Sequence, residues 1–74
     1  MSATSNKVVA LSKPYFGPAT ESFLARQCKA HLQIEFADLQ ESQLKELAKW
    51  VEIGGGLIMD AAKATAISKA IAEL

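Results

Sequence analysis

The sequence predicts a small all-α protein, an orthogonal bundle of three or four helices. Two observations predict it: apolar residues recur with a helical period over most of the chain, and no segment offers a pair of strands. With 74 residues, the chain has the size of one domain near the lower limit for a self-sufficient core. We expect residues 1–6 to form a disordered polar tail and residues 7–74 a single helical domain.

Two helices are predicted in the first half of the chain. Residues 7–13 form either a short extended segment or a turn or two of helix, and we expect helix because a lone strand is not stable. Pro14 is expected to end that helix, since proline disfavours the helical conformation in the residue before it. The next helix is expected to begin at Gly17-Pro18, because proline at the first helical position loses no hydrogen bond. Its apolar face consists of Phe16, Ala19, Phe23, Leu24, Cys28, His31 and Leu32.

Two further helices are predicted after a connection that begins near Gln33. Asp38 is expected to cap the first, with Glu41 three residues later at the spacing of a capping box. Asp60 is the expected N-cap of the last helix, which covers residues 61–73. The expected buried faces are Leu44, Leu47, Ala48 and Val51 in the first, and Ala64, Ile67, Ala70, Ile71 and Leu74 in the second.

The run Gly54-Gly55-Gly56 has two interpretations. Three glycines in a helix interior cost about 3 kcal/mol relative to alanine, which favours a break. However, Leu57 and Ile58 continue the apolar rows of the preceding helix. We expect the helix to run on to Met59, with the glycines allowing the backbone of a neighbour to approach closely.

Composition excludes several classes of protein. Eight basic and eight acidic side chains cancel, and no block of like charge occurs, which argues against a nucleic-acid partner. A single cysteine excludes an internal disulfide and fits a reducing compartment. Residues 1–6 have no apolar run, and the longest near-apolar stretch, residues 53–59, is too short to span a bilayer. We therefore expect a soluble cytoplasmic protein without a membrane partner.

Cys28 and His31 are the pair of residues most suggestive of chemistry. They stand three apart on one predicted helix, but a zinc site needs three or four protein ligands, and a nucleophile–base pair needs a third group to orient the imidazole. We expect Cys28 to pack as a small hydrophobic residue and His31 to lie at the edge of the core. No catalytic, cofactor-binding or metal-binding residues are predicted, and we expect neither enzymatic activity, a cofactor nor a small-molecule substrate.

The glycine run also permits a different class of function. A phosphate-binding loop requires Lys followed by Ser or Thr after its last glycine, whereas Leu57 and Ile58 follow here. Gly55-Gly56, with Ile53 two residues before them, resemble the double-glycine processing site of bacterial peptide precursors. A peptide precursor, cleaved after Gly56, is therefore one alternative function.

A family resemblance lies in residues 15–26, Tyr-Phe-Gly-Pro-Ala-Thr-Glu-Ser-Phe-Leu-Ala-Arg. This segment resembles the opening of a small helical bacterial domain of unknown function, which is often appended to signalling proteins beside kinase, response-regulator or phosphopeptide-binding modules. The resemblance covers about half of the chain, and the glycine run and alanine-rich last helix depart from the pattern. It implies an all-helical module that binds other proteins, and it carries over no functional residues.

The function we expect is protein–protein contact, as an interaction or signalling-adaptor module that forms a homodimer or binds another protein. The chain is rich in apolar residues for its size, and the stretch 50–59 is apolar nearly all round. A small nucleic-acid-binding regulator is the second alternative; it would require Arg26, Lys29, Lys45 and Lys49 to converge on one face. The expected contact surface consists of Trp50, Ile53, Gly54, Gly55, Leu57 and Ile58.

Overall fold

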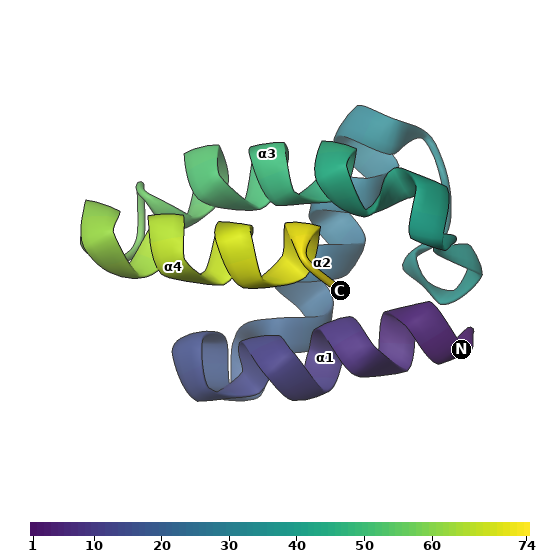
Figure 1. Cartoon of the computed structure of the whole chain (residues 1–74), viewed down its shortest axis with the longest axis horizontal. Coiled ribbons are helices and arrows are strands. Elements are labelled where there is room, and N and C mark those ends of the chain that lie inside the picture. The colour runs from purple at the N-terminus through teal and green to yellow at the C-terminus, as the bar shows by residue number, and fades with distance from the viewer.

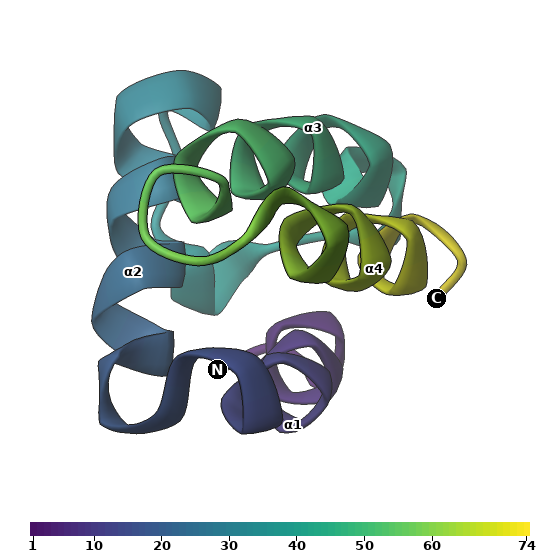
Figure 2. The ribbon, with the colours of Figure 1, turned by 90° about the vertical axis from the view of Figure 1, so that its left-hand side faces the viewer.

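A computed structural model describes all 74 residues and contains four α-helices and no strand, which confirms the predicted small all-α bundle. The helices are α1 (Ala3–Phe16), α2 (Thr20–Gln27), α3 (Leu44–Gly55) and α4 (Ala61–Ala72). The axes of α1, α3 and α4 are roughly aligned, whereas α2 crosses them at one side (Figures 1 and 2). No helix has both the length and the apolar character needed to cross a membrane.

Residues 1–6 differ from the predicted disordered tail, because α1 begins at Ala3. Ser2 is its N-cap, and the Ser2 hydroxyl oxygen accepts a hydrogen bond from the backbone N–H of Ser5 at 3.0 Å. Ser2 also donates from its backbone to the carbonyl of Ala37 and from its hydroxyl to the carbonyl of Leu39, each at 2.8 Å. The small polar residues at the start of the chain therefore cap a helix and attach it to the connection before α3.

Helix α1 includes the segment 7–13, as predicted, but it does not end before Pro14. It continues through Pro14 to Phe16 and ends at Gly17, which has a φ of +59° and donates its backbone N–H to the carbonyl of Lys13. A positive φ is readily adopted only by glycine, so Gly17 rather than Pro14 is the stop signal. Gly17–Ala19 form a single 3₁₀ turn, and α2 begins at Thr20, slightly later than predicted.

The connection between α2 and α3 corrects the predicted helix start at Asp38. A wider π-helical turn, Cys28–Leu32, follows α2 and ends at Gln33, which has a φ of +59°. Two 3₁₀ turns, Phe36–Asp38 and Glu41–Gln43, then precede α3. Between them, Leu39 has an extended backbone and a fully buried side chain. Burial of Leu39 interrupts helical geometry at the position where sequence alone predicted a continuous helix.

The 3₁₀ turn Glu41–Gln43, which leads directly into α3, has a hydrogen-bonded cap that lies two residues after Asp38. The Gln43 side-chain carbonyl accepts from the backbone N–H of Gln40 at 2.9 Å, and the backbone N–H of Gln43 donates to the carbonyl of Gln40 at 3.0 Å. Gln40 and Gln43 thus have the capping role that the spacing of Asp38 and Glu41 suggested.

Helix α3 ends at Gly55, so the predicted continuation to Met59 is wrong. Residues 56–59 form a tight turn in which the N–H of Gly56 donates to the carbonyl of Glu52 at 3.0 Å and that of Met59 to the carbonyl of Gly55 at 2.9 Å. The chain then reverses into α4, which lies antiparallel to α3 (Figure 1). The low helix propensity of glycine therefore prevails over the continuing apolar rows, and the helix ends within the glycine run. The turn that follows allows α4 to pack on α3.

The predicted N-cap of α4 is confirmed. The side chain of Asp60 accepts from the backbone N–H of Lys63 at 2.8 Å, so one of the unpaired donors of the first turn is satisfied. Farther along α4, the Ser68 hydroxyl donates to the backbone carbonyl of Ala48 in α3 at 2.8 Å. This bond joins the middle of α4 to the middle of α3.

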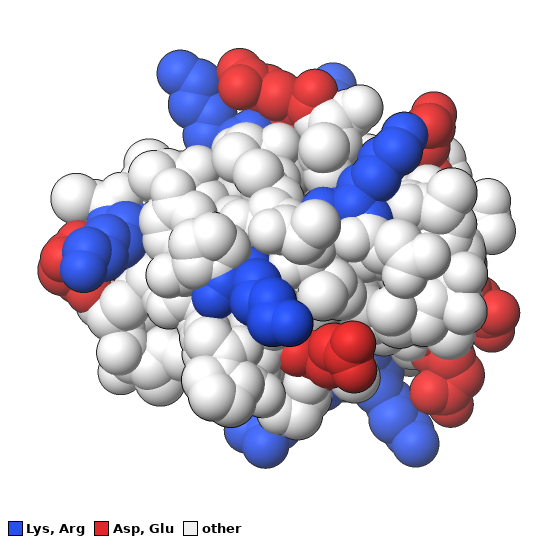
Figure 3. All heavy atoms as spheres, turned by 90° about the horizontal axis from the view of Figure 1, so that it is seen from below, with Lys and Arg blue, Asp and Glu red and all other residues white.

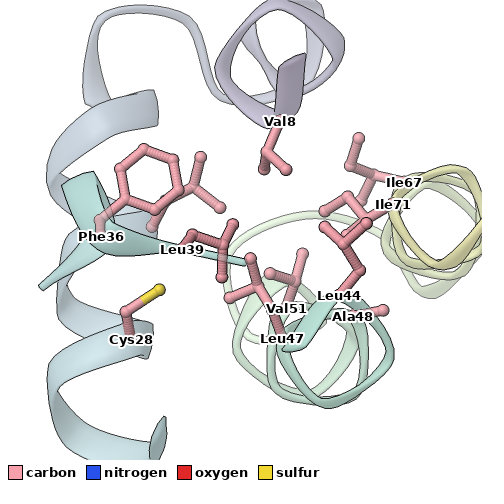
Figure 4. Close-up of a cluster of buried hydrophobic side chains, with 11 residues drawn as sticks. Val8, Cys28, Phe36, Leu39, Leu44, Leu47, Ala48, Val51, Ile67 and Ile71 are labelled. Carbon is pink, nitrogen blue, oxygen red and sulfur yellow. The ribbon is translucent and has the colours of Figure 1, made fainter. Parts of the chain in front are cut away.

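One hydrophobic cluster lies between all four helices (Figure 4). Helix α3 supplies four of its eleven members, whereas α1 supplies only Val8. The other fully buried residues of α1 are serines: the Ser5 hydroxyl donates to the carbonyl of Ser2 at 2.9 Å, but the Ser12 hydroxyl has no partner. The cluster consists of Val8, Leu24, Cys28, Phe36, Leu39, Leu44, Leu47, Ala48, Val51, Ile67 and Ile71.

We expect Ser12→Ala to stabilise the protein and Ser5→Ala to destabilise it. A buried hydroxyl without a partner costs free energy, so its removal from Ser12 should raise the free energy of unfolding by about 1 kcal/mol. Removal of the bonded hydroxyl of Ser5 should lower it by about 1 kcal/mol. Urea denaturation followed by circular dichroism measures both. Both substitutions replace a buried serine of the same helix, so equal effects would contradict the conclusion that only the Ser5 hydroxyl has a hydrogen-bond partner.

Candidate functional site

The candidate site is an apolar turn, residues 53–58, at the end of α3. Three of its side chains are largely exposed: Leu57 at 84%, Ile58 at 64% and Ile53 at 52%. Single exposed apolar residues are common on protein surfaces, but three within six residues form a patch, and such patches mark contact sites. Ile53 lies in the last turn of α3, and Leu57 and Ile58 follow its last residue, Gly55.

A hollow of about 320 Å³ lies beside the apolar turn, between α2 and the end of α3. Half of its lining residues are hydrophobic, and Arg26 is its only charged residue. Helix α2 supplies successive residues of one face, and the apolar turn supplies the opposite wall. The hollow is lined by Ala19, Ser22, Phe23, Arg26, Gln27, Gly54, Leu57 and Ile58.

Gly54, which lines this hollow, lies close to side chains of α2. A Cβ atom at Gly54 would lie 3.1 Å from Nε2 of Gln27 and 3.2 Å from Cζ of Phe23, distances that require the neighbours to move. Phe23 is held in place by stacking on Phe16, with ring centroids 4.5 Å apart. The missing side chain at position 54 therefore lets the two helices meet.

Two residues of the predicted contact surface are engaged within the chain. The ring of Trp50 stacks on that of His31, with centroids 3.8 Å apart and planes 6° from parallel, and Nζ of Lys49 lies 5.1 Å from the Trp50 ring centroid. Trp50 is half-buried, and its Nε1 atom is buried without a hydrogen-bond partner. Gly55 is buried, and a Cβ there would lie 3.5 Å from Cβ of Ala64. Ile53, Gly54, Leu57 and Ile58 remain at the apolar turn.

The α2 wall of the hollow was not predicted as part of the site. Ala19 and Phe23 belong to the predicted apolar face of that helix, whereas Ser22, Arg26 and Gln27 gave no signal of their own. Their spacing of three and four residues is consistent with one side of a helix. Nothing in the sequence links that side to a glycine run about 30 residues later.

Cys28 and His31 are in different environments, despite their spacing on the helix. Cys28 is fully buried in the hydrophobic cluster, and desolvation raises the pKa of its thiol from 9.0 to about 11. The expected packing of Cys28 as a small hydrophobic residue is therefore confirmed. His31 is exposed and stacked on Trp50, so its expected place at the core edge is wrong. No group of three or more His, Cys, Asp or Glu residues is placed to hold a metal ion.

Charged groups are dispersed on the face of the molecule shown in Figure 3. Basic and acidic side chains are interspersed there, and most of the surface between them is uncharged. No protein-family model, curated protein or solved structure matches this chain.

We expect the Cys28 thiol to be inert in the folded protein. A thiol reagent such as dithiobisnitrobenzoate should react with it at about pH 8 only after unfolding in urea, because the protonated, buried thiol is a poor nucleophile. Rapid reaction with the native protein would contradict its burial.

The same pKa shift predicts a loss of stability at high pH. Below pH 9.0 the thiol is protonated in both states; between 9.0 and about 11 the unfolded chain loses this proton first, which favours unfolding. The free energy of unfolding of the native chain, relative to that of Cys28→Ala, should fall across this range by up to about 2 kcal/mol. Urea titrations of both proteins measure the difference, since all other ionisable groups are shared. A constant difference would show that the two states have equal thiol pKa values.

Proposed function

We propose that this chain is a non-enzymatic protein-contact module that forms a homodimer through the apolar turn, residues 53–58. The observation that carries the proposal is the exposure of Leu57, Ile58 and Ile53 in one short segment. Exposure of an apolar cluster of this kind to water is unfavourable, and the free energy falls when a second surface covers it. Cys28 is fully buried, and its raised thiol pKa makes it a poor candidate for a nucleophile.

The size of the apolar turn limits the strength of this contact. Complete burial of one Leu or Ile side chain contributes about 1.5–3 kcal/mol, so the exposed parts of three such residues in two copies contribute roughly 6–12 kcal/mol. Association costs about 4–15 kcal/mol in lost freedom of motion. The most favourable combination of these figures leaves about 8 kcal/mol, which corresponds to a Kd of about 1 μM. This is the strongest dimer that the contact supports, and we expect a weaker, reversible one.

Neutral charge is compatible with such self-association. The chain has eight basic and eight acidic side chains, so two copies meet without net repulsion. A lone reduced thiol fits the cytoplasm, and we place the module there. A role as a signalling adaptor rests on the family resemblance of residues 15–26 alone.

Sedimentation equilibrium tests the proposed dimer over about 10 μM to 1 mM protein. The native chain should show a monomer–dimer equilibrium, and Leu57→Asp should shift it to monomer because a charge replaces the most exposed apolar side chain of the turn. Leu74→Asp is the matched control, since Leu74 is also exposed but follows the far end of α4. A native chain that remains monomeric at 1 mM would sink the proposal, as would an equal effect of the two substitutions.

A further inference from the structure

We infer that the hollow between α2 and the apolar turn is a binding site for a small carboxylate with an aliphatic chain, of the class of the medium-chain fatty acids. The aliphatic chain of the ligand lies on the apolar part of the hollow, and its carboxylate lies beside Arg26. All the lining residues belong to one copy of the chain, so this site does not depend on the proposed dimer.

The charge of the hollow favours an anionic ligand. Arg26 is the only charged residue among the eight that line it, and none of the eight is acidic. A carboxylate in the hollow is therefore close to one guanidinium group and to no like charge of the lining, whereas an ammonium group meets a like charge. Arginine also presents N–H donors in a planar fork, which matches the two oxygens of a carboxylate.

Polar and apolar residues are separated along the α2 wall. Arg26 and Gln27 lie in the last turn of the helix, Phe23 lies in its middle, and Ala19 is its N-cap. With a rise of 1.5 Å per residue, the wall extends about 10 Å from Ala19 to Arg26. An extended aliphatic chain advances about 1.2 Å per bond, so a carboxylate of about eight carbons has a matching length. Its charged end is then at Arg26 and its apolar end near Ala19.

Gly54 lies where the α2 wall changes from apolar to polar. A Cβ atom there would lie 3.2 Å from Cζ of Phe23 and 3.1 Å from Nε2 of Gln27, so both side chains lie against bare backbone. The Phe23 ring offers apolar surface to the chain of the ligand, and the Gln27 amide is a second N–H donor next to Arg26 in sequence. Leu57 and Ile58 provide the opposite, apolar wall.

The size of the hollow suits one small molecule. Its volume of about 320 Å³ is at the lower end of the range for small-molecule pockets. Arg26 is exposed, so water competes with the ligand for its guanidinium group. A ligand of about ten non-hydrogen atoms gains little affinity from such a site, and we expect a Kd of about 1 mM for octanoate.

Titration of the native chain with octanoate at neutral pH, followed by ¹H–¹⁵N NMR spectroscopy, tests the inference. The amide shifts should saturate with a Kd of about 1 mM, and the largest changes should fall on residues 19–27 and 53–58. Octylammonium has the same chain and the opposite charge, so it should bind at least about fivefold more weakly. Butanoate keeps the carboxylate and should also bind more weakly, because it buries less apolar surface.

Reversal of the charge at Arg26 tests its role separately from the apolar surface. Arg26→Glu should reverse the preference, so that octylammonium binds more tightly than octanoate, because the lining then carries one negative charge. Lys29→Glu is the matched control: Lys29 is exposed and lies one turn after Arg26, but it does not line the hollow. This control should keep the native preference. Circular dichroism verifies that both variants are folded, and Arg26→Gln, which should abolish the preference, replaces Arg26→Glu if the latter unfolds.

Three results would overturn the inference: no saturable shifts up to about 10 mM octanoate, saturable shifts centred outside the hollow, or equal effects of Arg26→Glu and Lys29→Glu. Equal effects would show attraction by overall charge rather than pairing with Arg26. Sedimentation equilibrium of the same samples without ligand measures the dimer separately. A monomeric chain that binds octanoate in the hollow would contradict the proposed function alone, whereas a dimer without saturable binding would contradict this inference alone.

Discussion

Helices α3 and α4 pack closely enough for Gly55 of one to lie against Ala64 of the other, and the remaining elements are arranged around this pair. Their facing sides supply six of the eleven cluster residues, and the bond from Ser68 to the carbonyl of Ala48 joins them at mid-length. Helix α2 crosses the pair, and α1 lies along it (Figure 2). For α4 to pack along α3, the chain must reverse between Gly55 and Ala61, and the apolar turn lies at this reversal.

The apolar turn is a consequence of that reversal. A continued helix would have carried Ile58 along the row of Leu47 and Val51, which are buried, and Leu57 along the row of Trp50 and Ile53. The turn after Gly55 directs them away from the cluster and towards the hollow beside α2, where Gly54 allows the two helices to approach closely. The same glycines thus allow close packing on one side of α3 and leave an apolar surface uncovered on the other.

Sequence alone predicts the fold class, the buried face of α3 and the cap at Asp60, because periodicity and capping depend on neighbouring residues. It also predicts most of the buried face of α4, although Leu74, which was expected on that face, is exposed. It fails where tertiary contacts decide the local conformation. The burial of Leu39 delays α3, and the ties from Ser2 to Ala37 and Leu39 hold residues that composition marks as a tail. The same holds for the candidate site. Sequence alone predicts the exposed turn, because its glycines and apolar residues are adjacent in the chain. It does not predict the α2 wall of the hollow, because that wall depends on a contact between distant parts of the chain.

The serine-lined face of α1 has a consequence for motion. Local opening of a helix costs little when few large apolar side chains leave the core, and α1 withdraws only one residue of the cluster, Val8, with Val9, Leu11 and Phe16 packed at its edge. We therefore expect amide hydrogens of α1 to exchange with solvent through a partial opening, and those of α3 and α4 to exchange only when the whole molecule unfolds. In such an opening, α1 would separate from the other three helices and expose the side of α4 that bears Ile67 and Ile71.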